Sequence, residues 1–282
     1  MTNLSDPQLT AIDRFRELHT SGCFLLPNPF DIGTAIYLHR LGFEALATSS
    51  AGFAFTRGLP DEVDAIPVDL MLQHIRELVE ATPLPVNADF QNGYADKPDD
   101  VAENVKRCVA TGVAGLSIED NSGSREEPLY DEVQAVERIK AARKAIDESG
   151  RKVVLTARCE AWLVGHPNPF EVAVKRLVAF AEAGADCLYA PGVTDWGEIS
   201  AIVQSVAPKP VNVLVSRPDP DLSLARLSQL GVRRISVGSA LSRVAWAAFI
   251  HSAQQIIDTG EFDSFADLAS FAELNNTFRN RS

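Results

Sequence analysis

The sequence lacks several features that would place it in common classes of protein. Its four cysteines lie far apart and show no CxxC or Cys/His ligand spacing: Cys23, Cys108, Cys159 and Cys187. Both a disulfide framework and a zinc site of ordinary spacing are therefore excluded. No stretch approaches the roughly 20 apolar residues that span a bilayer, and the N-terminus has no basic segment followed by an apolar one. We expect free thiols in a cytoplasmic protein that has no membrane partner.

Positive charge is also in short supply. The chain has 26 Lys and Arg residues against 38 Asp and Glu, which gives a formal net charge of −12. This surplus repels nucleic acid and anionic membrane surfaces, so neither is expected as a partner. An anionic substrate would need a local cation, either an arginine or a metal ion, to overcome the field of the whole protein.

A regular alternation of short apolar runs and longer segments of helical period fills the chain. The runs that predict β-strands are 24–27, 45–49, 85–90, 115–119, 153–158, 187–190, 211–215 and 234–237. Amphipathic segments at 35–41, 101–110 and 133–146 predict helices between them, and glycines such as Gly42 and Gly112 follow several helices where a left-handed cap is favoured.

Eight such units of about 30 residues account for nearly all of the 282 residues. We therefore predict one domain over residues 1–282, a (β/α)8 barrel of the TIM type with its active site at the C-terminal ends of the strands. A doubly wound open sheet is the alternative. A nucleotide enzyme of that class would need a glycine-rich first turn, and the first turn here reads Pro27-Asn28-Pro29-Phe30-Asp31.

Polar residues stand at the ends of several predicted strands, where a strand buried on both faces should be apolar. Asn87, Asp89 and Gln91 alternate along the third strand and share one face, as do Arg158 and Glu160 on the fifth. The shared parity indicates that these side chains project into the barrel.

Acidic side chains that converge at this mouth favour a hard metal ion. Asp89 from the third strand and Glu119 from the fourth offer the oxygen ligands that Mg²⁺ accepts while it keeps several waters. Arg158 could then hold a substrate carboxylate in a bidentate pair. The alternative interpretation is that these charges form a structural ring of ion pairs.

Five segments, met in order through nearly the whole chain, resemble the isocitrate lyase and phosphoenolpyruvate mutase superfamily. They are Thr48-Ser49-Ser50-Ala51-Gly52, Gly58-Leu59-Pro60-Asp61, Asp89-Phe90-Gln91-Asn92-Gly93-Tyr94, Ser117-Ile118-Glu119-Asp120 and Ala157-Arg158-Cys159-Glu160-Ala161. Together they are quite specific. The resemblance implies enzymes that make or break carbon-carbon or carbon-phosphorus bonds beside a 2-oxo or enolate group, with Mg²⁺ or Mn²⁺ stabilising the enolate oxygen.

The resemblance also implies roles for individual residues. Asp89 looks like the principal metal ligand, and Asp61 and Glu119 would hold waters around the metal. Two departures bear on the chemistry. Gln91 is neutral where many relatives have an acid, and the segment 121–130 lacks the lysine-lysine-cysteine-glycine motif whose cysteine supplies a proton in isocitrate and methylisocitrate lyases.

The substrate would be held, by the same resemblance, on two sides. Ser49 and the backbone amides of Ser50 and Ala51 would cradle its carboxylate or oxyanion, and Arg158 would complete the clamp. Asn212 lies inside the apolar run 211–215, so it needs either a buried hydrogen-bond partner or a ligand, and we count it among the candidate substrate contacts.

Other polar residues near the strand ends have plainer interpretations. Cys159 has the parity of the helical layer, which predicts a packing role. His166 could reach the mouth as an acid or base, but an exposed loop histidine is the simpler interpretation. Tyr94 and Arg125 could contact substrate, or could serve as loop packing and as a solvated charge.

The C-terminal helices predicted at 244–257 and 265–274 carry more apolar surface than an outer helix needs, including Trp246, Phe249, Ile250 and Phe271. Members of the superfamily exchange their eighth helix between paired subunits. The resemblance therefore implies a swapped C-terminal helix, with residues from about 244 to 282 used in a homodimer or homotetramer.

These observations favour a magnesium-dependent lyase or decarboxylase that cleaves a carbon-carbon bond of a small 2-oxo or 2-hydroxy dicarboxylate through an enolate. A phosphonate mutase or hydrolase is the second hypothesis, with Arg125 the cation offered for a phosphoryl group on the loop after the fourth strand. The third is a degenerate ligand-binding barrel. Gln91 and the missing cysteine motif support it, whereas the presence of Asp89, Glu119 and Arg158 opposes it.

Overall fold

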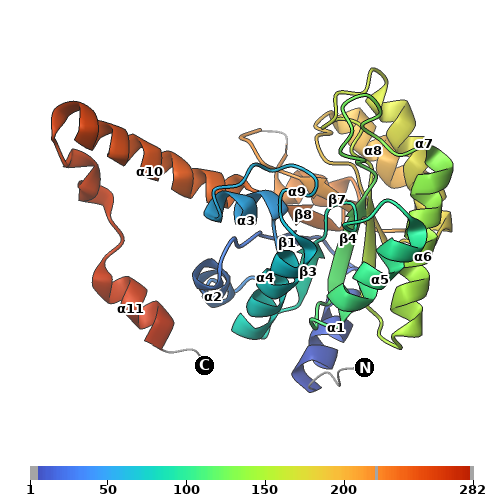
Figure 1. The fold of residues 1–282 in the computed structure, drawn as a ribbon, viewed down its shortest axis with the longest axis horizontal. Coiled ribbons are helices and arrows are strands. Elements are labelled where there is room, and N and C mark those ends of the chain that lie inside the picture. Colours follow the sequence, from blue (N-terminus) through green and yellow to red (C-terminus); the bar gives the residue numbers. More distant parts are fainter. Residues whose placement is uncertain (1–5, 220–221, 280–282) are drawn as a thin grey trace.

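Eight parallel strands form the centre of the computed structural model, which describes residues 6–219 and 222–279 (Figure 1). The strands are β1 (Phe24–Leu26), β2 (Leu46–Ala47), β3 (Val86–Asp89), β4 (Gly115–Glu119), β5 (Val154–Arg158), β6 (Cys187–Tyr189), β7 (Val211–Leu214) and β8 (Arg234–Ser236). The helices are α1 (Asp6–Leu18), α2 (Ile32–Arg40), α3 (Ser50–Thr56), α4 (Val68–Ala81), α5 (Pro98–Val109), α6 (Glu132–Glu148), α7 (Pro169–Glu182), α8 (Trp196–Ser205), α9 (Leu224–Gln229), α10 (Ala240–Thr259), the 3-10 helix η1 (Asp263–Asp267) and α11 (Phe271–Arg279).

The strands follow one another around a barrel that is nearly closed. Their order is β1-β8-β7-β6-β5-β4-β3-β2, and every ladder is parallel. The two ends of the sheet meet where the amide of Ala47 donates to the carbonyl of Pro27 at 3.0 Å, and where Asn28 Nδ2 donates to the carbonyl of Thr48 at 2.8 Å. The predicted (β/α)8 barrel is confirmed, and the doubly wound sheet is excluded because β1 lies beside β8.

The helices around the barrel begin and end near the predicted positions, with one error. The segment 265–274 was predicted as one helix, but η1 ends at Asp267, the backbone at Leu268 is extended, and α11 begins only at Phe271. Ser270 explains the break: its hydroxyl accepts from the amide of Glu273 at 3.1 Å, which is the bond of a new helix N-terminus.

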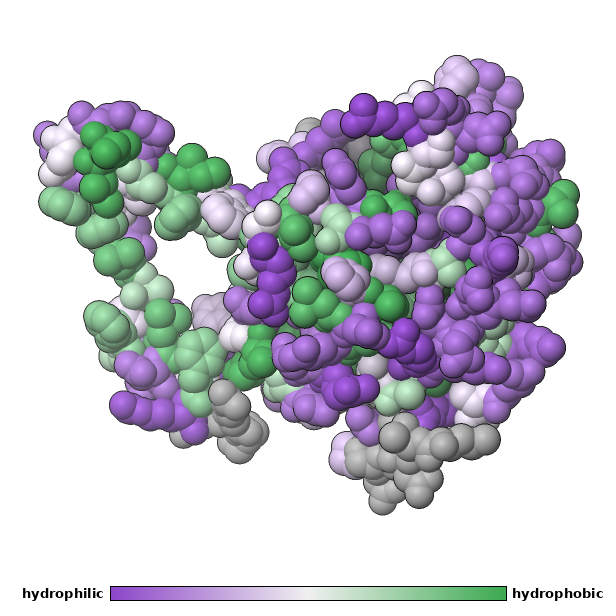
Figure 2. Space-filling model, in the orientation of Figure 1, coloured by the Kyte–Doolittle hydropathy of each residue, from purple (hydrophilic) through white to green (hydrophobic). Residues whose placement is uncertain are grey.

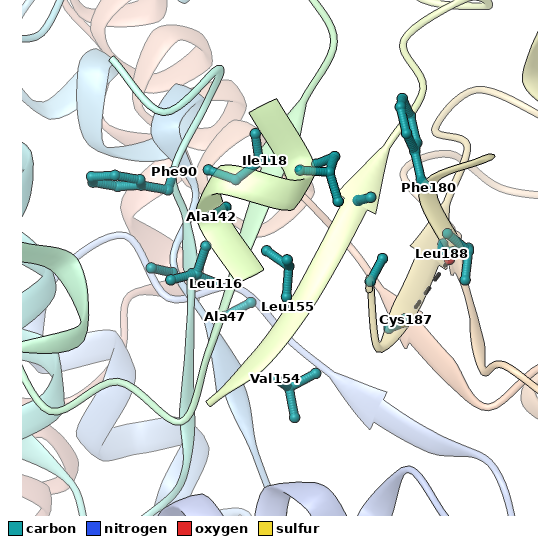
Figure 3. Close-up of a cluster of buried hydrophobic side chains, with 14 of the residues drawn as sticks. Ala47, Phe90, Leu116, Ile118, Ala142, Val154, Leu155, Phe180, Cys187 and Leu188 are labelled. Atoms are coloured by element: carbon teal, nitrogen blue, oxygen red, sulfur yellow. Dashed lines mark hydrogen bonds between the residues drawn. The ribbon is translucent and has the colours of Figure 1, made fainter. Parts of the chain in front are cut away.

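The hydrophobic core lies between the outer face of the barrel and the surrounding helices. Leu116 and Ile118 of β4 and Leu155 of β5 are almost fully buried there, and Phe180 of α7 packs in the same cluster (Figure 3). Residues of the opposite parity face into the barrel, where β3, β4, β5 and β7 carry polar groups. Because apolar contacts on the outer face stabilise the fold, the inner face is free to carry chemistry.

Helix α1 covers the N-terminal ends of the strands. The ring of Phe15 packs edge-on against Phe24 of β1, with centroids 6.1 Å apart. It also lies so close to Gly115 that a Cβ at that position would stand 2.6 Å from the Phe15 ring. This end of the barrel is therefore closed by apolar packing, and access from solvent is left to the opposite end.

The C-terminal segment leaves the barrel as an arm. Helix α10 projects away from the strands, the chain turns at Gly260 with a left-handed φ of 72°, and α11 returns to α2, where Arg40 Nη1 donates to the carbonyl of Asn276 at 2.8 Å (Figure 1). Apolar residues stand exposed along the arm, which shows as hydrophobic colour in Figure 2: Val244, Trp246, Phe249, Ile250, Ile257, Leu268 and Phe271.

No helix among residues 6–219 and 222–279 is both long enough and apolar enough to cross a membrane.

Candidate active site

A cavity of about 150 Å³ opens at the C-terminal ends of the strands. Its walls come from the loops after β1 and β2 and from the inner-face residues of the other strands, among them Asp89, Arg158, Asn212 and Arg234. The volume is well below the roughly 300–1,000 Å³ of pockets for drug-sized ligands. The cavity therefore suits a compact ligand rich in polar atoms.

The predicted inward parity of Asp89, Arg158 and Glu160 is confirmed by a cluster of charges around Arg158. Its Nη1 lies 2.7 Å from Asp89 Oδ1, its Nη2 3.3 Å from Glu119 Oε2 and its Nε 2.8 Å from Glu160 Oε1. The phenol ring of Tyr189, next along the barrel on β6, lies 5.0 Å from the guanidinium carbon. Three carboxylates from β3, β4 and the end of β5 thus converge on one cation.

The cluster is largely removed from water, and this shifts the pKa values of its side chains. Burial raises the pKa of Glu119 well above its usual value and raises that of Glu160, with Arg158 opposing both shifts. Burial by itself lowers the pKa of Arg158, but Glu119, Glu160 and Asp89 together hold it well above the usual value. Arg158 therefore stays cationic, whereas burial favours the neutral forms of Glu119 and Glu160, so a second cation near them would stabilise their carboxylates.

Asp89 is held from the other side by the start of α3. Its Oδ2 accepts two bonds from Ser50, one from the amide and one from the hydroxyl, each 2.9 Å long. Asp61 lies exposed at the rim of the cavity, where desolvation by the surrounding protein and then the charge of Asp89 raise its pKa. The two aspartates are thus close enough to repel one another.

The segment Ser49–Ala51 lines the cavity, but one of its backbone amides is used differently from the expectation. Ser49 is the N-cap of α3, and its Oγ accepts from the amide of Gly52 at 3.1 Å. The amide of Ser50 was expected to face substrate, and in the structure it donates to Asp89. The amide of Ala51 lies in the first turn of α3, where N–H groups have no carbonyl partner inside the helix.

The charge balance of the site fits a divalent cation. Among the described residues no three His, Cys, Asp or Glu side chains are placed to bind one metal ion together. Mg²⁺ does not need such a cage, since it is usually bound through one or two carboxylates and several waters. Asp89 would hold the ion, with Asp61 and Glu119 as acceptors for its waters, and the ion would offset the excess of carboxylates over Arg158.

Asn212 lines the cavity and has hydrogen-bond partners within the protein. Only 1% exposed, it donates from Nδ2 to Ser236 Oγ at 2.9 Å and accepts at Oδ1 from Arg234 Nε at 2.8 Å. The side chain therefore has the buried partners that its position required.

Arg234 itself was not predicted as a site residue. The signal was available, because a charged residue at the start of a buried strand shares the parity of Ser236.

The loop after β3 is strained and held by buried arginine. Gln91 and Tyr94 adopt left-handed φ values of 43° and 56°, which non-glycine residues rarely do. Arg138 of α6, 1% exposed, donates to the carbonyls of Asn92, Ala95 and Asp96. These three hydrogen bonds hold in place the backbone that follows Asp89. They give Arg138 a structural role in the loop after β3.

The remaining candidates do not line the cavity. Cys159 is fully buried in the hydrophobic core, which confirms the packing role, and burial raises the pKa of its thiol. His166 Nδ1 accepts from the amide of Asn168 at 3.1 Å in an exposed turn. Arg125 is exposed and does not line the cavity, and the buried hydroxyl of Tyr94 has no hydrogen-bond partner among the described residues.

Comparison with known proteins relates the chain to a family. The model of the phosphoenolpyruvate phosphomutase family matches residues 15–257. A candidate lyase or mutase of known structure from Burkholderia cenocepacia is 45% identical, with a TM-score of 0.92 over 97% of each chain. The oxaloacetate decarboxylase of Pseudomonas entomophila is 30% identical over 80% of this chain and 78% of its own. The 2-methylisocitrate lyase of Halalkalibacterium halodurans is 27% identical over 94% of this chain and 88% of its own.

Proposed function

The chain belongs to the phosphoenolpyruvate phosphomutase family of lyases and mutases, as its motifs indicated, and we propose that it is a magnesium-dependent decarboxylase or lyase of a small 2-oxo or 2-hydroxy dicarboxylate. The observation that carries the proposal is the guanidinium of Arg158 held among Asp89, Glu119 and Glu160 in the wall of a small cavity. Magnesium bound at Asp89 would supply positive charge to stabilise an enolate oxygen.

The residues of the chain would bind and orient the substrate. Arg158 pairs with a substrate carboxylate through its planar fork, and the hydroxyl of Ser49 and the amide of Ala51 donate to the oxygens on the opposite side. Both donors line the cavity. This arrangement restrains a 2-oxo acid in one orientation, so that the bond to be broken lies next to the carbonyl that takes up the electrons.

Decarboxylation fits the loop after β4 better than a lyase reaction that needs a cysteine acid. When a 3-carboxylate leaves as carbon dioxide, the electron pair of the broken bond enters the enolate, and water can later supply the proton to carbon. No cysteine is required, and residues 121–130 contain none. The exposed position of Arg125, outside the cavity, argues against phosphonate chemistry, which would need a cation over the phosphoryl group.

A substrate screen tests the proposed function. Oxaloacetate, 2-methylmalate, 2,3-dimethylmalate and phosphonopyruvate are each incubated with the protein, with Mg²⁺ or with EDTA, and products are followed by NMR. We expect turnover of a dicarboxylate that stops when EDTA is present. Turnover of phosphonopyruvate alone, or turnover of a dicarboxylate that EDTA leaves unchanged, contradicts the proposal.

We also propose that the C-terminal arm is exchanged between paired subunits. Phe249 is 63% exposed and Ile257 79% exposed, and α10 makes no extensive contact with a barrel element among the described residues. Exposed apolar surface of this kind marks an interface.

The expected cytoplasmic location rests on the free thiols and stays a prediction.

Removal of residues 244–282 is expected to convert a dimer or tetramer into an unstable, aggregating species, because the surface that receives the partner's arm becomes exposed. Light scattering coupled to gel filtration and thermal unfolding measure both effects. Phe249→Glu should weaken assembly, whereas His251→Glu, about 200° around the helix, should not. A soluble, stable monomer after truncation shows that the arm is not exchanged.

A further inference from the structure

Arg234 is a buried cation whose hydrogen-bond partners are all neutral. It is the first residue of β8, is 2% exposed, and projects to the inner face of the barrel. Its Nε donates to Asn212 Oδ1 at 2.8 Å, its Nη2 donates to Thr156 Oγ1 at 3.1 Å, and its Nη1 lies 3.3 Å from His19 Nε2. Among the described residues no carboxylate lies within ion-pair distance of Arg234, in contrast to Arg158.

The neighbouring histidine does not supply the missing charge. Burial, and then the charge of Arg234, lower the pKa of His19 to about 3, so that the imidazole is neutral at physiological pH and accepts the bond. A guanidinium removed from water without a counter-charge is costly, and proteins generally pair such a group. Three neutral acceptors leave two of its five N–H donors without a bond in this set.

The position of the Arg234 guanidinium relative to the Arg158 cluster follows from its bond to β5. Thr156, which accepts from Arg234, precedes Arg158 by two residues on the same face of β5. The guanidinium of Arg234 thus lies at the level of Thr156, one layer of inner-face residues from Arg158, or about 7 Å along β5 at 3.3 Å per residue. Both line the same cavity, Arg158 at its mouth and Arg234 at its floor.

Charge is distributed unevenly along this cavity. Asp61 and Asp89 line the mouth together with Arg158, which Glu119 and Glu160 also contact, whereas Arg234 gives the floor a positive charge. The mouth therefore repels a free carboxylate that the metal and Arg158 do not hold, and the floor attracts it.

We propose that Arg234 forms a second anion subsite at the floor of the cavity, which takes the distal carboxylate of a dicarboxylate substrate. The inference rests on the proposed function, since it assumes that the first carboxylate is held at the mouth. It makes Arg234 a specificity residue: the enzyme distinguishes a 2-hydroxy or 2-oxo diacid from the corresponding monoacid by pairing the additional carboxylate with this guanidinium. The competing interpretation is a brace that only orients Asn212 and Thr156.

The experiment compares two ligands that share one end. L-Lactate and L-malate are both 2-hydroxy acids, and only malate has a second carboxylate. Their affinities, and that of oxalate, are measured by calorimetry at saturating Mg²⁺ on the full chain, for the wild type, for Arg234→Gln and for Arg233→Gln. Arg233 is the matched control, because it lies next to Arg234 with the opposite parity and donates to the carbonyl of Gly22 near the surface.

We expect the wild type and Arg233→Gln to bind malate at least about tenfold more tightly than lactate. Arg234→Gln should lose that preference by about tenfold, with lactate and oxalate unchanged, since a charge-assisted hydrogen bond to the second carboxylate is removed. A preference that survives in Arg234→Gln overturns the proposal. Equal weakening of all three ligands overturns it also, because that is the result of a brace.

Failure of the proposed function gives a different pattern. If oxalate does not bind the wild type with Mg²⁺, the site at the mouth is wrong, while a preference for malate that depends on Arg234 still supports the subsite. Should Arg234→Gln unfold, Arg234→Lys keeps the charge. One ammonium cannot hold Thr156 and Asn212 and also pair with a carboxylate, so the preference for malate should fall several-fold. An unchanged preference in Arg234→Lys overturns the subsite.

Discussion

Replacing Asp89 by asparagine is expected to abolish magnesium binding and to reduce turnover of the dicarboxylate substrate by about a thousandfold. The carboxylate of Asp89 is the side chain best placed to hold the ion, because Arg158 and Ser50 orient both of its oxygens. A bound metal lowers the free energy of the negatively charged transition state by several kcal/mol. Since each 1.4 kcal/mol is about tenfold in rate, a loss of this size corresponds to roughly three orders of magnitude.

Asparagine is the informative substitution at this position because it preserves the shape of the side chain. Its amide oxygen can still accept from the Ser50 amide, and Arg158 keeps Glu119 and Glu160 as ion-pair partners. The fold should therefore persist, as circular dichroism and thermal unfolding can check. Asp64→Asn is a matched control, since Asp64 is exposed and its φ of 66° suits asparagine equally well.

Calorimetric titration with Mg²⁺ and with Mn²⁺ measures the binding, and the NMR assay measures turnover. The wild type and Asp64→Asn should bind one divalent ion, and Asp89→Asn should show no binding in the same concentration range. Undiminished binding in Asp89→Asn places the metal elsewhere. In that case the carboxylates around Arg158 are a structural ring of ion pairs, which is the alternative left open by the sequence pattern.

The fold could be predicted from the sequence because each strand of a barrel has the same local signal. Short apolar runs separated by helical segments gave the correct number of strands, and the alternation within β3 and β5 placed Asp89 and Arg158 on the inner face. Polar residues in strands buried on both faces are costly unless they are used. They were therefore visible against an apolar background without any knowledge of the tertiary structure.

Contacts between distant segments could not be predicted in the same way. The bond from the Ser50 amide to Asp89 joins residues 39 apart in the chain, and that from Arg234 to Thr156 joins residues 78 apart. Parity shows which face a side chain occupies but not which partner it meets there. The parity that Arg234 shares with Ser236 could have placed it on the inner face, but could not have shown that Asn212 and Thr156 are its partners there.

The break between η1 and α11 was missed for a different physical reason. Apolar spacing over 265–274 is compatible with a continuous helix, and hydrophobic residues outweighed the weaker signal of Ser270. Most helical stability in proteins comes from tertiary packing, and the arm has little of it within its own subunit. Local capping by Ser270 therefore decides where the last helix begins.

Arg158→Lys is expected to keep the fold and the metal site but to weaken the binding of oxalate, a planar mimic of the enolate. The guanidinium of Arg158 uses all three nitrogens, each directed at a different carboxylate from β3, β4 or the end of β5. Three of its five N–H donors are used in this way, and the two that remain, one on each Nη, are the donors that would hold one carboxylate of a ligand. A lysine ammonium keeps the charge but is a single point, and it cannot reproduce two parallel bonds.

Losing one of two charge-assisted hydrogen bonds to oxalate costs roughly 1.5 to 3 kcal/mol, which is about tenfold to a hundredfold in affinity. Calorimetry at saturating Mg²⁺ measures it, with Mg²⁺ affinity recorded separately so that a damaged metal site is not mistaken for a damaged clamp. Arg76→Lys, on the exposed face of α4, controls for the substitution itself. Equal oxalate affinity in wild type and Arg158→Lys assigns Arg158 to the structure alone. In that case the metal and Arg234 at the floor are the cations that attract the substrate, against the repulsion from a protein of net charge −12.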